Sequence, residues 1–309
     1  MRHDSLGGLT MVSRKCAIVL AAILTVCSIP ASGAQQGRGP QGPPPPLAVH
    51  QLKPNVYWIG GGDGSNNGVI IGDKGVILFD TKTSQDSEKD TLAAIAKITP
   101  KPVVAVVISH SDFDHIGGLP VLPKGVTIIA QENCKKLMEE SITKGGRGAA
   151  SLDYLPTKTY DKKLSMTIEG EKLEVLHWAP AHTSGDTVLY LPKEKIVFGG
   201  DLLISEIPLA FLHMDEGGSA SGWIESMKGM AALDSNTYVA GHGDVTDRAE
   251  IQRRVIAAQK EFDQVKALVA QGKTLPEIKQ TLGVTPQKTP GGMPLPDFSE
   301  YVYHDLTAK

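Results

Sequence analysis

The sequence predicts an α/β protein in which two β-sheets pack against each other and helices cover their outer faces. Three observations support this prediction. Strand-like runs and helices alternate along the first half of the chain, and a second set of strands and helices follows. Residues 101–109 form a continuous apolar run rich in valine and isoleucine, which is typical of a strand buried on both faces. With 309 residues, the chain is long enough to bury one large core or two small ones.

The first β-rich part begins near residue 55. Residues 55–61, 67–72 and 74–81 are short β-rich runs separated by glycine and aspartate, which predicts a meander of strands. Residues 84–98 begin with Ser and an early Asp and then place apolar residues at helical spacing, so we expect a helix there. The buried strand at 101–109 follows this helix and leads directly into a polar loop.

The second β-rich part has the same mixed character. Its predicted elements are four strands, a helix, a strand with its loop, a long helix and a short helix, at residues 163–170, 171–180, 186–192, 195–201, 221–233, 236–244, 246–272 and 274–283. This order of elements fits two sheets packed together with helices outside, and no repeat at solenoid spacing is present.

The N-terminus has the pattern of a secretory signal. Arg14 and Lys15 precede an apolar run, and Ser32 and Ala34 suit a cleavage site after Ala34. The apolar run is shorter than the ~20 residues that span a bilayer, so we expect cleavage, no stable membrane anchor and a periplasmic or secreted product. The signal is already complete from Met11, so the sequence leaves open whether Met1 or Met11 is the start.

The predicted domain organisation follows from these boundaries. Residues 1–34 are a signal peptide, 35–49 a Pro/Gly-rich linker, 50–272 the main domain and 273–309 a C-terminal helical extension. After cleavage only Cys134 remains, so an internal disulfide is excluded, and we expect a buried structural thiol in a helix. The formal net charge of −3 does not favour nucleic acid as a partner. We expect a small-molecule substrate, and the oligomeric state does not follow from the sequence.

Candidate metal ligands follow several predicted strands. Two histidines and two aspartates lie within six residues, and single candidates follow later strands: His110, Asp112, Asp114, His115, His182, Asp201 and His242. Adjacent carboxylates on one loop repel each other unless a cation or hydrogen bonds neutralise them. Imidazole and carboxylate suit zinc, and also iron or manganese. Of the other histidines, only His213, in the loop 204–223, is a candidate for a functional role, as a side chain that contacts the substrate.

These segments, "HSDFDH", "AHT", "GGD" and "GHG", resemble the motifs of the metallo-β-lactamase superfamily in the same order, from about Val56 to Asp244. The resemblance implies a four-layer αββα sandwich with two metal ions, most commonly zinc, at one edge of the sheets. It implies that the first metal binds His110, Asp112 and His182 and the second Asp114, His115 and His242. Asp201 would bridge the two metals, and a hydroxide between them would be the nucleophile.

Asp112 departs from the family pattern, which has histidine at this position. A carboxylate oxygen still binds zinc at a similar distance, but its charge makes the metal a weaker acid and its shorter side chain shifts or loosens the first site. Iron or manganese therefore becomes a better candidate than usual, and incomplete filling of the first site stays open.

The resemblance implies an exported metallo-hydrolase that cleaves an ester, thioester, lactone or lactam bond, with Asp114 expected to take part in catalysis. A bridging aspartate at 201 resembles the glyoxalase-, lactonase- and phosphodiesterase-like members more than β-lactamases, which usually have Cys or Ser there. Three alternatives stay open: a β-lactamase proper, an iron-dependent redox or sulfur-metabolising member of the same fold, and a non-catalytic binding protein.

Overall fold

The computed structural model describes residues 44–144, 152–288 and 294–308. The predicted signal peptide and the predicted linker up to residue 43 lie outside the described residues. Across the described ranges, no helix combines the length and the apolar character that a bilayer crossing requires.

The first sheet contains the predicted meander and the buried strand. Its strands lie side by side in chain order: β1 (Ala48–Lys53), β2 (Val56–Gly60), β3 (Asn67–Ile71), β4 (Val76–Phe79), β5 (Val103–Val107), β6 (Thr127–Gln131) and β7 (Lys158–Tyr160). Strands β1 to β4 pair antiparallel, and β4 to β7 pair parallel. Parallel pairing needs crossover connections, which include α1 (Gln85–Ala96) before β5 and α3 (Glu132–Lys144) before β7.

The second sheet has the order β12-β11-β10-β9-β8. Its strands are β8 (Lys163–Ile168), β9 (Glu171–Leu176), β10 (Val188–Leu191), β11 (Ile196–Phe198) and β12 (Thr237–Val239). Pairing is antiparallel from β8 to β11, whereas β11 and β12 are parallel. A separate two-stranded pair is formed by β13 (Gln287–Lys288) and β14 (Pro294–Leu295).

The remaining helices are short near the polar loop and long in the C-terminal part. They are α2 (Phe113–Ile116), α4 (Ala220–Ala232), α5 (Arg248–Ala270), α6 (Leu275–Leu282) and α7 (Phe298–Thr307), with single 3₁₀ turns at Leu119–Val121, Leu152–Tyr154, Gly200–Leu202 and Met214–Glu216. Helix α5 begins where the side chain of Asp247 accepts a hydrogen bond from Glu250 N, a standard N-cap.

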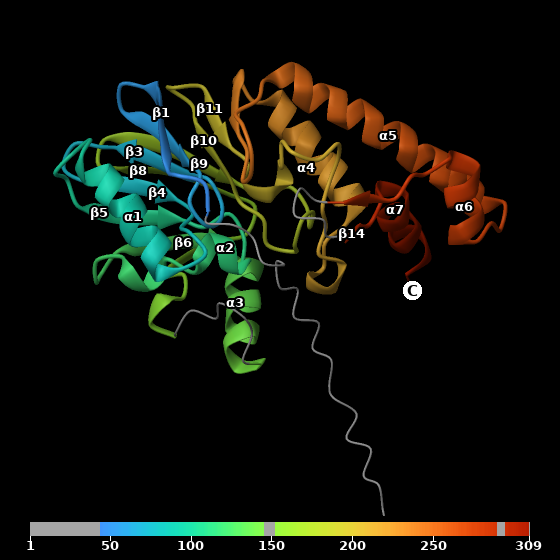
Figure 1. Cartoon of the computed structure of the whole chain (residues 1–309), viewed down its shortest axis with the longest axis horizontal. Coiled ribbons are helices and arrows are strands. Elements are labelled where there is room, and N and C mark those ends of the chain that lie inside the picture. Colours follow the sequence, from blue (N-terminus) through green and yellow to red (C-terminus); the bar gives the residue numbers. More distant parts are fainter. Residues whose placement is uncertain (1–43, 145–151, 289–293, 309) are drawn as a thin grey trace, which may run out of the picture. The chain divides into compact units, whose positions relative to one another are not determined.

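Buried side chains divide into three clusters that define four layers. One cluster joins the inner faces of the two sheets, for example Ile77 and Phe79 of β4 with Phe198 of β11. The opposite face of β4, through Val76 and Leu78, packs with α1 and α3. The outer face of the second sheet packs with α4, α5, α6 and α7. The helices α1 and α3 and the helices α4 to α7 can be followed in Figure 1. The predicted αββα sandwich of two mixed sheets is therefore confirmed.

The parallel pairs explain where the candidate residues lie. His110 follows β5, Asp201 follows β11 and His242 follows β12. Since β11 and β12 run parallel, their C-terminal ends meet at one edge, and the side chains that follow them become neighbours.

Candidate metal centre

The loop after β5 carries four of the predicted residues and is held by a buried aspartate. Ser109 N donates to Asp80 Oδ1 at 2.6 Å. The next residues turn into α2, for which Asp112 is the N-cap residue. Aspartate commonly caps a helix with its own carboxylate, yet Asp112 makes no such bond. The Asp112 carboxylate is instead directed toward histidines, which indicates a binding role rather than a capping role.

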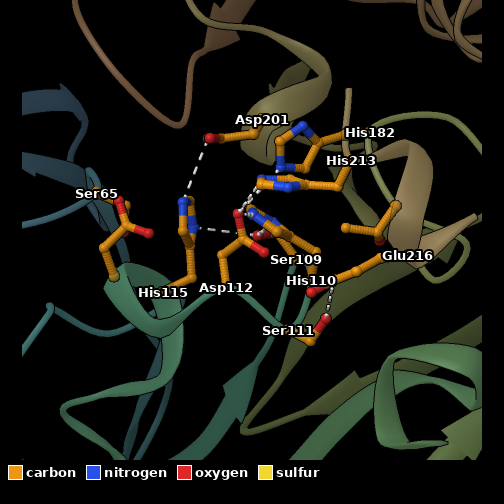
Figure 2. A network of polar contacts seen from close by, with 12 residues as sticks. Ser65, Ser109, His110, Ser111, Asp112, His115, His182, Asp201, His213 and Glu216 are labelled. Carbon is orange, nitrogen blue, oxygen red and sulfur yellow. Dashed lines mark hydrogen bonds and ion pairs between the residues drawn. The ribbon is translucent and has the colours of Figure 1, made fainter. Parts of the chain in front are cut away.

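The first cluster consists of His110, Asp112 and His182, whose ligand atoms lie within 4.8 Å of one another. Asp112 Oδ2 is 3.5 Å from His110 Nε2 and 3.3 Å from His182 Nε2. Figure 2 shows these imidazoles converging on the Asp112 carboxylate. His182 Nδ1 donates to the carbonyl oxygen of Phe211 at 2.7 Å, which leaves Nε2 to face the cluster.

The second cluster consists of Asp114, His115 and His242. His242 Nε2 is 3.2 Å from Asp114 Oδ2 and 3.4 Å from Asp201 Oδ2, and His115 Nε2 is 3.3 Å from Asp201 Oδ1. A third group that could hold a cation joins His110, His115 and Asp201. Asp201 therefore lies between the two clusters and is within reach of a histidine from each.

These distances and the absence of hydrogen-bond partners fit a metal centre. Ligand atoms about 2.0–2.2 Å from a tetrahedral zinc ion lie roughly 3.3–3.6 Å apart, which is close to the imidazole-to-carboxylate distances given above. Among the described side chains, His110 Nε2, His115 Nε2 and Asp201 Oδ1 are buried with no hydrogen-bond partner. Buried polar atoms without hydrogen-bond partners are costly, so three of them directed at one place suit a site that binds a cation. The residues present therefore fit divalent metal ions.

The electrostatics of the cluster are those of coupled acids and imidazoles. Burial alone would raise the pKa of Asp112 and Asp201, but the neighbouring histidines outweigh it and hold both pKa values well below the usual range. Burial would likewise lower the pKa of His182 and His242, yet the adjacent carboxylates raise them to about 9 and about 10. At neutral pH a metal ion must therefore displace protons from these imidazoles.

Glycines without side chains leave space for Asp201 in the metal centre. A Cβ atom added to Gly241 would lie 2.0 Å from Asp201 Oδ1. Gly200 has a φ of +53°, and a Cβ there would lie 2.5 Å from the Cβ of Ser109. The glycines beside Asp201 and His242 are thus required by packing at the site, as their position in the sequence suggested.

All seven predicted ligands meet at this site, and their role as ligands stays a prediction. Sequence reasoning missed Asp80, whose Oδ2 accepts a hydrogen bond from His115 Nδ1 at 2.9 Å. Asp80 is fully buried and has a φ of 59°, which is unusual for a residue other than glycine. An aspartate directly after a buried strand was the only signal in the sequence. His213 was underestimated, because its Nε2 lies 3.0 Å from Asp112 Oδ2.

The fold and the paired clusters define a class of protein, an αββα sandwich with a candidate two-metal centre at the edge of its sheets. The sequence profile of the metallo-beta-lactamase superfamily matches residues 60–242, which is more than half of the chain. The chain therefore belongs to the metallo-beta-lactamase superfamily, whose members typically bind a metal.

Three relatives illustrate the range of activities around this chain. The alpha subunit of 2,4-dinitroanisole O-demethylase from Nocardioides sp. is 29% identical over 56% of this chain. A linear primary-alkylsulfatase from Pseudomonas sp. is 25% identical over 71% of it. The chain spans 51% and 50% of the length of these two relatives. A type 2 metallo-beta-lactamase from Elizabethkingia meningoseptica is 26% identical over 67% of this chain and 83% of its own length. These relatives are an O-demethylase subunit, an alkylsulfatase and a metallo-beta-lactamase, so enzymes with different activities resemble this chain.

Proposed function

We propose that this protein is an exported hydrolase that uses two divalent metal ions to cleave an ester, thioester, lactone or lactam bond. The observation that carries the proposal is the position of Asp201, which contacts His115 and His242 and lies beside His110. A carboxylate shared between two ligand clusters suits a pair of metal ions. Export rests on the signal-like segment at 1–34.

Metal ions bound in this way would acidify a water molecule and polarise the bond to be cleaved. The protein's own part is to orient the ligands. The carbonyl of Phe211 fixes the His182 ring, and Asp80 fixes the His115 ring, so that both Nε2 atoms face the site. Asp114, whose side chain is 17% exposed, lies where solvent reaches the centre and would accept a hydrogen bond from the attacking water.

The wall of the site favours a substrate without a full negative charge at the cleaved bond. Within the described residues, the ion pairs of Asp112, Asp114 and Asp201 are all with histidines, and none is with lysine or arginine. Ser111 Oγ donates to Glu216 Oε2 at 3.3 Å, which adds another acid at the rim. Carboxylic esters, thioesters and lactones suit such a rim better than anionic monoesters do.

A sulfate ester is the second candidate. Its support is the alignment with the linear primary-alkylsulfatase, which covers 268 residues. In this case the metal ions would neutralise the sulfate, because no described lysine or arginine pairs with the acids of the site. A β-lactam is a third candidate because of the type 2 metallo-beta-lactamase relative.

The test is a substrate panel with the full chain loaded with zinc, iron or manganese. A nitrophenyl carboxylic ester, a thioester, a lactone, a nitrophenyl sulfate and a chromogenic cephalosporin would be compared before and after treatment with a chelator. We expect turnover of the ester, thioester or lactone that chelation removes and metal restores. Turnover of the sulfate or the cephalosporin alone would select the second or third candidate. Turnover that survives complete metal removal would contradict the proposal.

A further inference from the structure

The family pattern places an imidazole where this chain has Asp112, and the structure places another imidazole against that same carboxylate. We propose that His213 is a ligand of the first metal ion and replaces the imidazole missing at position 112. The first site would then have the donors His110, Asp112, His182 and His213. This inference rests on the proposed metal-dependent function and extends it to a residue outside the family motifs.

The distances around Asp112 carry the first step. Asp112 Oδ2 lies 3.0 Å from His213 Nε2, which is nearer than its distances of 3.3 Å to His182 Nε2 and 3.5 Å to His110 Nε2. Three imidazole nitrogens therefore surround one carboxylate oxygen, and Figure 2 shows His213 beside His182 at this point. Of the three histidines, His213 makes the shortest contact with Asp112.

The backbone holds His213 at this position. His213 N donates to the carbonyl oxygen of His182 at 2.8 Å, so the two candidate ligands are joined through their main chains. The His213 carbonyl accepts a hydrogen bond from Gly218 N at 2.8 Å. A Cβ atom on Gly218 would lie 2.6 Å from the His182 carbonyl and 2.9 Å from the His213 carbonyl. Only glycine permits this close packing, which fixes the loop that carries His213 against the segment that carries His182.

The ring of His213 is confined on two sides. Its centroid is 4.9 Å from the ring of His182 and 4.9 Å from the ring of Phe211, with edge-to-face geometry in both cases. Phe211 also supplies the carbonyl that orients His182. The segment from Phe211 to His213 therefore positions one imidazole and contributes a second one, which is the arrangement that a built ligand site requires.

The aspartate at position 112 explains why the first metal site would need an additional imidazole. An aspartate is shorter than a histidine and brings a negative charge, so the first metal would be less strongly held and less acidic with His110, Asp112 and His182 alone. A neutral imidazole adds a ligand without adding charge. Three imidazoles and one carboxylate suit zinc, iron and manganese.

The test is a titration of the metal-free full chain with Co²⁺, followed by absorption of the bound ion and by total metal content. Wild type is expected to bind two ions. In His213→Ala, the affinity of the first site should fall by more than about 100-fold, because losing a partner that only orients a ligand costs roughly 10- to 100-fold. The absorption bands of the first ion should also change. His304→Ala, on the exposed surface of α7, is the matched control and should behave as wild type.

A rescue separates a ligand from a positioning residue. The double variant Asp112→His/His213→Ala restores the family's donor set, so its first-site affinity should return to within about 10-fold of wild type. Normal first-site affinity in His213→Ala would overturn this inference and leave the proposed function intact, as would a weak first site that Asp112→His fails to rescue. Wild type that binds no ion at all would overturn the proposed function as well. Thermal unfolding of the metal-free variants reports on folding independently of the metal.

Discussion

The role of Asp80 provides the most detailed prediction. Its Oδ1 accepts a hydrogen bond from Ser109 N at 2.6 Å, and its Oδ2 accepts one from His115 Nδ1 at 2.9 Å. Asp80→Asn keeps the size of this side chain and its tolerance of a positive φ, but it leaves only one accepting oxygen. If that oxygen stays with Ser109, the new amide group faces His115 Nδ1 and forces the ring proton onto Nε2. His115 then loses the lone pair that faces the second cluster.

Losing the partner of a metal-binding histidine typically costs 10- to 100-fold in affinity, which is about 1.4–2.7 kcal/mol. For Asp80→Asn we expect the upper end of this range at the second site, because the substitution both removes a bond and selects the wrong tautomer. The assay is competition for Zn²⁺ with a chromophoric chelator, followed for each of the two ions. Glu88→Gln is the control, since Glu88 is also fully buried but bonds to Lys82 N rather than to a histidine. Equal affinities in Asp80→Asn and wild type would refute the reasoning.

Three further predictions concern the same centre. Asp114→Ala should lower turnover by at least about two orders of magnitude, the scale for losing an activated nucleophile, while near-normal turnover would place catalysis elsewhere. Gly241→Ala should displace Asp201 and lower the metal content measured by elemental analysis, because its Cβ would lie 2.0 Å from Asp201 Oδ1; unchanged content would contradict the packing argument. The pKa values of His182 and His242 are raised from 6.5 to about 9 and about 10. The contribution of these two histidines to the stability of the metal-free protein should therefore be complete below pH 6.5. It should be lost as the pH rises through 9 to 10. Metal affinity should rise over the same range, because the imidazoles must lose protons to bind; thermal unfolding and Zn²⁺ titration across this range would show both trends or their absence.

The regular elements and the main ligand segments were predictable from the sequence. Strands β5 and β11 are continuous apolar runs, and β12 is the short run Thr-Tyr-Val. A candidate ligand beside a small residue follows each strand three positions after its end. Functional residues commonly lie in loops at the ends of strands, so the four segments that carry the candidate ligands could be expected to meet. Two aspartates and two histidines within six residues added a local signal that solvated loops rarely show.

The supporting residues could not be predicted because they carry no spacing of their own. Asp80 reaches His115 across 35 positions of sequence, and only the parallel pairing of β4 with β5 brings the two together. His213 lies in a loop with no period, and its place depends on the backbone bond to His182 and on the close packing at Gly218. Tertiary contacts of this kind follow from the folded backbone and leave no pattern in the sequence around either residue.

The central claim is that scattered imidazoles and carboxylates form one paired metal centre. The most direct measurement is anomalous X-ray diffraction at the zinc edge from crystals of the full chain grown with Zn²⁺. The account predicts two peaks on either side of Asp201. One is contacted by His110, Asp112, His182 and His213, and the other by Asp114, His115 and His242. Peaks at other residues, or no peak within bonding distance of these side chains, would contradict it.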